Sequence, residues 1–158
     1  MPDSTAPVTD DVRLNQSYEI EIEPKATMDS LIEGVGFDYV HPLINTLAAT
    51  ERGVTPGQRS FRLIHPDLVL TDRFVREELK RQHLRPAKLA DLIFLVRRYP
   101  NLCEGIQVVA LGSPFWQSSD AAEADVPIIR CNDGRMRLAF VPLSFAGDHY
   151  YLGIEEAA

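Results

Sequence analysis

The sequence contains few cysteines and no long apolar run, and each absence argues against a class of protein. Cysteine accounts for 2 of the 158 residues. Cys103 and Cys131 are too far apart in the chain to form a CxxC metal or redox motif, and we expect them to be reduced thiols. No apolar run reaches the roughly 18 residues that a membrane-spanning helix needs, so we expect no membrane association.

Positive charge is also scarce. The chain carries 16 Lys and Arg residues against 23 Asp and Glu residues, which gives a formal net charge of −7. This balance argues against direct binding to the phosphate backbone of a nucleic acid. The segment from Met1 to Asp11 lacks the basic and apolar regions of a secretory signal. The expected compartment is therefore the cytoplasm, either of a bacterium or of an infected cell.

Motifs of the known enzyme classes are missing. The chain has no Walker motif, no GxGxxG fingerprint, no HExxH pair, no EF-hand loop and no GxSxG elbow. We therefore expect no cofactor and no bound metal. The first hypothesis for function is a non-catalytic binding module, with another protein as its partner.

The N-terminal part of the chain predicts one strand and one helix. Residues 1–15 are polar and are predicted to be a mobile tail. Tyr18 to Glu23 alternate apolar and acidic residues, which is typical of a half-buried edge strand. Ala26 to Val35 have helical spacing of apolar residues. The aromatic segment 37–42 is expected to be irregular, and the segment from Asn45 to Gly57 is expected to be a loop.

The middle of the chain predicts a strand and two helices. The strand runs from Ser60 to Ile64, and Thr71 would then cap a helix from Asp72 to about His83. Pro86 would lie in the first turn of a second helix, which is apolar over much of its girth and is expected to be the most buried one. The buried side of the first helix is assigned to Phe74, Val75 and Leu79.

The C-terminal part predicts four antiparallel strands. Asn132-Asp133-Gly134 is a tight turn between two of them, because Asn, Asp and Gly tolerate positive φ. The overall prediction is a single α+β domain over residues 16–158, with an antiparallel sheet of about five to six strands and two or three helices packed on one side. The four strands are expected at Ile106–Leu111, Val126–Cys131, Met136–Val141 and His149–Ile154.

Several motifs resemble those of a family of small uncharacterised proteins that are frequent in uncultivated bacteria of reduced genome. They are Leu84-Arg-Pro-Ala-x-Leu-x-Asp-Leu92, Tyr99-Pro100-x-Leu102, and Val109-Ala-Leu-Gly-Ser113 with Trp116. The resemblance covers about residues 60–154. It implies the order of the elements but no activity, because the family has none established.

The sequence departs from that family's pattern at two positions. Lys88 stands where the family usually has Thr, and Gly153-Ile154-Glu155 replaces a basic ending. A second likeness is to C-type-lectin-like domains, which share an Arg-x-Pro helix start, a loop with Trp and a terminal antiparallel sheet. This second resemblance implies long loops that hold ligands or partners, although a fold does not fix a function.

Two loops are the candidate binding surface. The loop from Gly112 to Asp125 contains Phe115 and Trp116, and Trp is among the residues enriched at interface hot spots. Phe145 in the second loop, Pro142–Asp148, would join them. The structural alternative is that Trp116 folds back and closes the core under the loop.

A basic stretch offers a further candidate. Residues 71–100 hold 8 basic and 4 acidic residues. Arg73, Arg76 and Lys80 recur at spacings of three and four and would share one helix face. That face is either solvated, with Glu77 paired to Arg81, or a docking face for a carboxylate-rich partner or a phosphate.

Two other functions remain as alternatives. A small hydrolase or metal-assisted enzyme would use His65, Asp67 and His149, and it requires these three side chains to meet in one cleft. A virus-encoded inhibitor or structural subunit would also fit the small size and the acidity of the chain. The sequence leaves the ligand and the oligomeric state open.

Overall fold

The computed structural model describes residues 12–23, 27–51, 56–65, 72–143 and 149–155. These residues form a mixed α+β fold, as the sequence predicts, with one large sheet and four α-helices. The sheet has eight strands, which is more than the expected five to six, because β2 and β4 are short pieces that the alternation pattern does not mark. The strands are Tyr18–Ile22 (β1), Tyr39–Val40 (β2), Gly57–Ile64 (β3), Leu84–Pro86 (β4), Gln107–Val109 (β5), Asp125–Asn132 (β6), Arg135–Pro142 (β7) and Tyr150–Glu155 (β8).

The strand order is β1-β3-β8-β5-β6-β7-β2, and β4 pairs with β8 off this path. Most neighbours are antiparallel, but β8 runs parallel to β5, and β2 runs parallel to β7. The four C-terminal strands are therefore not one antiparallel series as expected. The last strand instead returns to the middle of the sheet, between β3 and β5, where both of its edges are paired.

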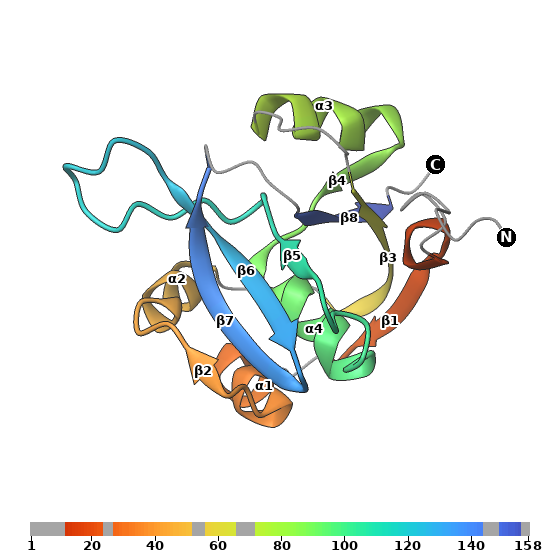
Figure 1. Cartoon of the computed structure of the whole chain (residues 1–158), viewed down its shortest axis with the longest axis horizontal. Coiled ribbons are helices and arrows are strands. Elements are labelled where there is room, and N and C mark those ends of the chain that lie inside the picture. Colours follow the sequence, from red (N-terminus) through yellow and green to blue (C-terminus); the bar gives the residue numbers. More distant parts are fainter. Residues whose placement is uncertain (1–11, 24–26, 52–55, 66–71, 144–148, 156–158) are drawn as a thin grey trace, which may run out of the picture.

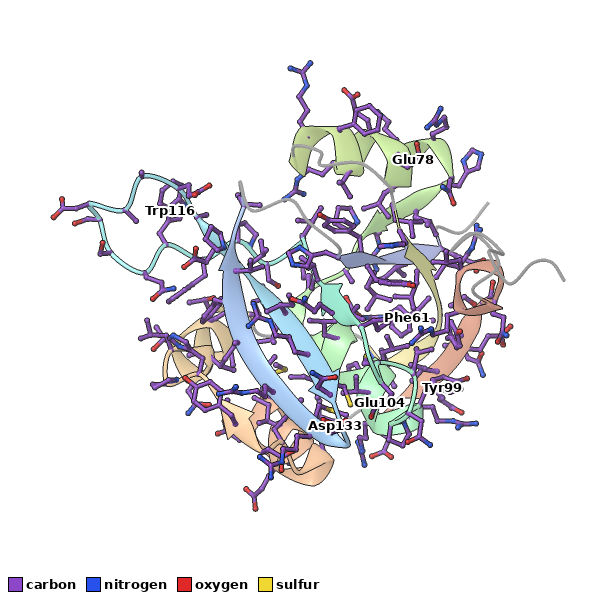
Figure 2. The ribbon with its side chains drawn as sticks, viewed as in Figure 1. Phe61, Glu78, Tyr99, Glu104, Trp116 and Asp133 are labelled. Carbon is purple, nitrogen blue, oxygen red and sulfur yellow. The ribbon has the colours of Figure 1, made fainter. Side chains whose placement is uncertain are left out.

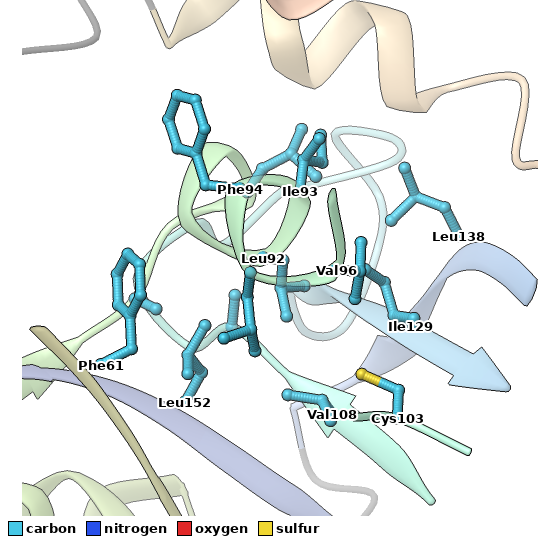
Figure 3. Packing of buried hydrophobic residues seen from close by; sticks show 14 of the residues in the cluster. Phe61, Leu92, Ile93, Phe94, Val96, Cys103, Val108, Ile129, Leu138 and Leu152 are labelled. Carbon is cyan, nitrogen blue, oxygen red and sulfur yellow. The ribbon is translucent and has the colours of Figure 1, made fainter. Parts of the chain in front are cut away.

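The helix α4 (Leu89–Arg98) lies against the concave side of the curved sheet (Figure 1). The prediction that this helix is the most buried one is confirmed, since every residue from Asp91 to Val96 is buried. Leu92 and Val96 point towards Val108, Ile129 and Leu152 of the sheet (Figure 3). This is the larger of two hydrophobic clusters, and α1 (Met28–Val35) and α2 (Ile44–Thr50) pack onto it as well.

The helix α3 (Asp72–Arg81) packs on the opposite face of the sheet, so the four helices are not all on one side. Its Val75 and Leu79 join a second cluster with Val109 and Ile128, whereas their strand neighbours Val108 and Ile129 belong to the α4 side. Successive residues of a strand face opposite sides, which separates the two clusters.

Gly153 of β8 is what lets α3 and β4 come so close to the sheet. A Cβ at this position would lie 2.9 Å from Cδ2 of Leu79 and 2.9 Å from Cβ of Leu84.

The predicted buried side of α3 is confirmed for Val75 and Leu79 but wrong for Phe74, which is 49% exposed. Phe74 lies one residue before the buried Val75, which places it about 100° around the helix from Val75, and it points away from the sheet.

Two segments that we expected to be irregular are ordered. Residues 45–50 of the predicted 45–57 loop belong to α2, because Ile44, Leu47 and Ala48 supply an apolar stripe that packs into the core. Residues 52–55 of that segment lie outside the described residues. Tyr39 and Val40 pair with β7 as β2, a contact that no local pattern could signal.

The edge strand and the tight turn agree with the prediction, whereas the start of α4 does not. The alternation of Tyr18–Ile22 is confirmed as an edge strand. Asp133 and Gly134 have φ of 54° and 77°, which confirms the tight turn between β6 and β7. Pro86 ends β4 rather than opening a helix, and α4 begins at Leu89. Thr71, the proposed cap of α3, lies outside the described residues.

The predicted tail also differs at its end. Residues 12–15 form a short 3₁₀ helix, and residues 1–11 lie outside the described residues. Arg13 donates from Nη1 to the backbone carbonyls of Leu102 and Glu104, at 3.0 and 3.1 Å. Its guanidinium also lies over the ring of Tyr150, 5.5 Å from the centroid. All three partners are about 90 or more residues away in the chain, so no local pattern could indicate them.

Candidate functional site

The loop that follows β5 projects from the body of the protein (Figure 1). Its neck is closed by a strand-like pair, in which the backbone N–H groups of Phe115 and Asp125 each donate to the other's carbonyl at 2.7 Å. The Phe115 ring stacks on Phe140 of β7, with 5.2 Å between the ring centroids. Phe115 thus anchors the loop and is half-buried, rather than forming its exposed surface.

Trp116 is the exposed aromatic residue of this loop, with 57% of its surface accessible (Figure 2). The chain is extended at the neck, so Trp116 points away from the side on which Phe115 packs. The structural alternative, in which Trp116 folds back to close the core, is therefore not what the structure shows. Phe145, the third aromatic residue of the predicted surface, lies outside the described residues.

The three basic residues of α3 have three different environments. Arg76 donates from Nη2 to the backbone carbonyl of Leu111 at 2.6 Å, and so ties α3 to the start of the loop. Arg73 pairs with Glu77 at 3.6 Å, and both side chains are largely exposed. Lys80 is exposed in the last turn. The predicted docking face is thus divided, because one of its three cations is held by a backbone group.

The acidic residues of α3 also pair differently from the prediction. Arg81 contacts Glu78 rather than Glu77. Together with Phe74 and Glu77, these two residues line a shallow hollow of about 270 Å³. The hollow lies on the outer side of α3, away from the sheet.

The histidines of the enzyme alternative do not share one cleft. The His65 ring stacks on Tyr150 at 4.1 Å, and its Nδ1 lies 3.0 Å from the backbone carbonyl of His149. The buried His149 ring instead lies edge-on to Tyr151, at 6.4 Å. Tyr150 and Tyr151 belong to opposite faces of the sheet, so the two imidazoles lie on opposite sides of β8. Asp67 lies outside the described residues.

A polar cluster at the N-terminus of α4 was not singled out from the sequence. Asp91 is 2% exposed, forms an ion pair with Arg59 at 2.7 Å, and accepts the backbone N–H of Lys88 at 2.9 Å. The buried Ser113 hydroxyl accepts the N–H of Leu89 at 2.8 Å. Asp91 follows Lys88 by three residues, which is the spacing of a capping box. This spacing in the sequence could have predicted the polar cluster.

Glu51 lies beside this cluster. Burial raises the pKa of its carboxyl above the ordinary value, and the Ser113 hydroxyl and Lys88 partly offset the effect. The Asp91 carboxylate and the Ser113 hydroxyl accept the N–H groups of Lys88 and Leu89 at the start of α4. Both buried side chains therefore have hydrogen-bond partners. We therefore assign the cluster a structural role in fixing the helix.

Both cysteines are reduced and buried. Burial raises the pKa of the Cys103 thiol to about 12. Burial and the adjacent Glu104 carboxylate raise the pKa of the Cys131 thiol to about 11. These thiols are protonated at neutral pH and are poor nucleophiles. In the part of the chain that the structure describes, no group of three or more His, Cys, Asp or Glu residues is arranged to hold a metal ion.

No protein-family model, no curated protein and no solved structure matches this chain. The resemblances drawn from the motifs therefore remain predictions. Among the described residues, no helix has the length and apolar character that crossing a membrane requires. The exposed Trp116, on a loop whose neck is closed by the Phe115–Asp125 pair, is the main candidate binding feature of the chain.

Proposed function

We propose that this protein is a non-catalytic binding module that contacts another protein through the 112–125 loop, with Trp116 as the anchor. The observation that carries the proposal is the 57% exposure of a tryptophan on a projecting loop. Exposing a large apolar side chain to water is unfavourable in free energy, and burial in a partner's pocket removes this penalty.

The neck of the loop supports this function because it limits the entropy lost on binding. The Phe115–Asp125 backbone pair and the Phe115–Phe140 stack fix the residue before Trp116. Arg76 fixes the start of the loop at Leu111. A side chain on a preorganised loop loses less conformational entropy on binding than a side chain on a flexible segment.

The charge around Trp116 suggests the chemistry of the partner surface. The loop contains three acidic residues, Asp120, Glu123 and Asp125, and no basic residue. The expected partner therefore offers an apolar pocket with a basic rim, since opposite charges around a hot spot speed encounter and set orientation.

Trp116 is the one tryptophan in the chain, so its fluorescence reports on this site alone. The test begins with affinity capture from a lysate of the source organism, using the wild type, Trp116→Ala and, as a matched control, Phe74→Ala, another exposed aromatic residue. A partner lost with Trp116→Ala and kept with Phe74→Ala is then purified and titrated into the wild type.

The expected result is a blue shift of the tryptophan emission on binding, together with a loss of about tenfold or more in affinity for Trp116→Ala. The proposal fails if a stoichiometric partner binds with unchanged emission and binds Trp116→Ala as tightly as the wild type. Circular dichroism of both variants checks that the fold is intact.

A further inference from the structure

Four residues form a straight row across four strands at the end of the sheet far from the Trp116 loop. Gln107 of β5 pairs with Arg130 of β6, which pairs with Arg137 of β7, which pairs with Tyr39 of β2. Figure 1 shows β5, β6, β7 and β2 side by side in this order. We call these four residues the arginine row. Both arginines are exposed, and Tyr39 is 39% exposed.

The row is held together by side-chain contacts. Arg130 donates from Nε to Oε1 of Gln107 at 3.0 Å. The guanidinium of Arg137 lies over the Tyr39 ring, 5.0 Å from its centroid. Each guanidinium is therefore positioned by a neighbour, and the terminal N–H groups of Arg130 are not used in the bond to Gln107.

Two like charges directly opposite each other on adjacent strands repel and destabilise a sheet. Arg130 and Arg137 are such a pair. Arg135 lies two residues from Arg137 on the same side of β7 and adds a third positive charge. Among the described residues, no carboxylate forms an ion pair with any of these three arginines. The chain nevertheless has 23 acidic residues, so the lack of a partner is not a matter of composition.

We propose that the arginine row is a binding site for the carboxylates of an acidic segment of a protein partner. A guanidinium offers paired donors that match a carboxylate, and two of them side by side hold it on both sides. An anion between Arg130 and Arg137 would also relieve their mutual repulsion. The proposal uses a different surface from the Trp116 loop and does not depend on it.

The charge of the whole protein favours a protein segment over a nucleic acid. A polyanion such as DNA or RNA gains affinity by neutralising many phosphates. Here three arginines stand in a chain of net charge −7, so a long polyanion would contact only these few cations while the rest of its charge is repelled by the protein. Tyr and Arg are also among the residues that dominate protein interfaces.

The test is an NMR titration of the full chain, observing backbone amides and arginine Nε–Hε signals, with a hexaglutamate peptide as the probe. The variants are Arg130→Gln and Arg137→Gln, and the matched control is Arg97→Gln, an exposed arginine in the last turn of α4. Inorganic phosphate and a hexathymidylate are titrated in parallel at constant ionic strength.

We expect hexaglutamate to shift the signals of Arg130, Arg137 and Tyr39, and not those of the Trp116 loop. We expect Arg130→Gln or Arg137→Gln to weaken binding about tenfold, because each removes charge-assisted hydrogen bonds, and Arg97→Gln to leave it unchanged. The proposal is overturned if hexaglutamate shifts no signal in the row at millimolar concentration, or if the two variants bind as the wild type does. Tighter binding of phosphate or hexathymidylate than of hexaglutamate would overturn the assignment to a carboxylate partner.

Discussion

The carboxylate of Glu104 accepts the backbone N–H of Asp133 at 2.9 Å, although the two residues are 29 positions apart (Figure 2). Glu104 also accepts the N–H of Gly134 at 3.1 Å and contacts the thiol of Cys131. One side chain thus binds the tight turn between β6 and β7 from outside the hairpin. Because this hairpin sets the register that places Arg130 opposite Arg137, Glu104 supports the arginine row as well.

Replacing Glu104 by Ala should lower the free energy of unfolding by about 1–2 kcal/mol. The change removes two hydrogen bonds from backbone N–H groups to a charged acceptor, and the exposure of Glu104 keeps the loss near the lower end of the usual range. Urea unfolding followed by circular dichroism measures it. Glu33→Ala, an exposed acid on α1, is the control. Equal stability of the two variants would show that the turn does not need Glu104.

Stability should fall between pH 8 and pH 10. The thiol pKa values of Cys103 and Cys131 are raised from 9.0 to about 12 and about 11. In this range the unfolded chain releases thiol protons that the folded chain keeps, so unfolding becomes more favourable as pH rises. The contribution is fully present below pH 9 and amounts to about 1 kcal/mol per thiol over this interval.

Urea unfolding under reducing conditions at both pH values tests this linkage. The reference is the double variant Cys103→Ala, Cys131→Ala, which keeps the titration of all other groups. The wild type should lose more stability than the double variant between the two pH values. Parallel losses in the two proteins would contradict the raised thiol pKa values.

Replacing Gly153 by Ala should destabilise the protein by about 1–3 kcal/mol, the usual cost of overpacking. The new Cβ would lie 2.9 Å from Cβ of Leu84 and from Cδ2 of Leu79, so α3 and β4 would have to move. The matched control is Gly34→Ala on α1, where a Cβ meets nothing within 4 Å. That control should gain about 0.5–1 kcal/mol, because Ala is the better helix former. Thermal unfolding of the two variants gives the comparison, and a Gly153→Ala variant as stable as the wild type would be inconsistent with this packing.

The ion pair between Asp91 and Arg59 should couple strongly in a double-mutant cycle. Asp91 is 2% exposed, so Asp91→Ala should cost about 3 kcal/mol by removing a buried charge partner and the bond to the Lys88 N–H. Arg59→Ala should cost a similar amount, because it leaves the buried Asp91 carboxylate without its charge partner. The free energies of unfolding of the single and double variants give the coupling energy. A double variant whose loss equals the sum of the two single losses would mean that the pair is not coupled.

The sequence by itself determined those features that depend on neighbours along the chain. Alternation predicted the strand Tyr18–Ile22, apolar residues over much of the helix girth predicted α4, and Asp133-Gly134 predicted the turn between β6 and β7. A two-residue turn also fixes the register of its hairpin. The pairing of Arg130 with Arg137 could therefore have been read from their equal distances to that turn.

The tertiary structure decided what depends on residues far apart in the chain. β8 inserts between β3 and β5 because the edges of these two strands are open to it, and no local sequence pattern encodes which edges are open. The Thr, Gly and Pro residues of segment 45–57 predict a loop, but Ile44 and Leu47 pack into the core and residues 44–50 are helical. Whether Phe74 and Trp116 are buried or exposed likewise depends on what the rest of the chain brings to them. Local periodicity is encoded by neighbours, whereas burial is a property of the assembled fold.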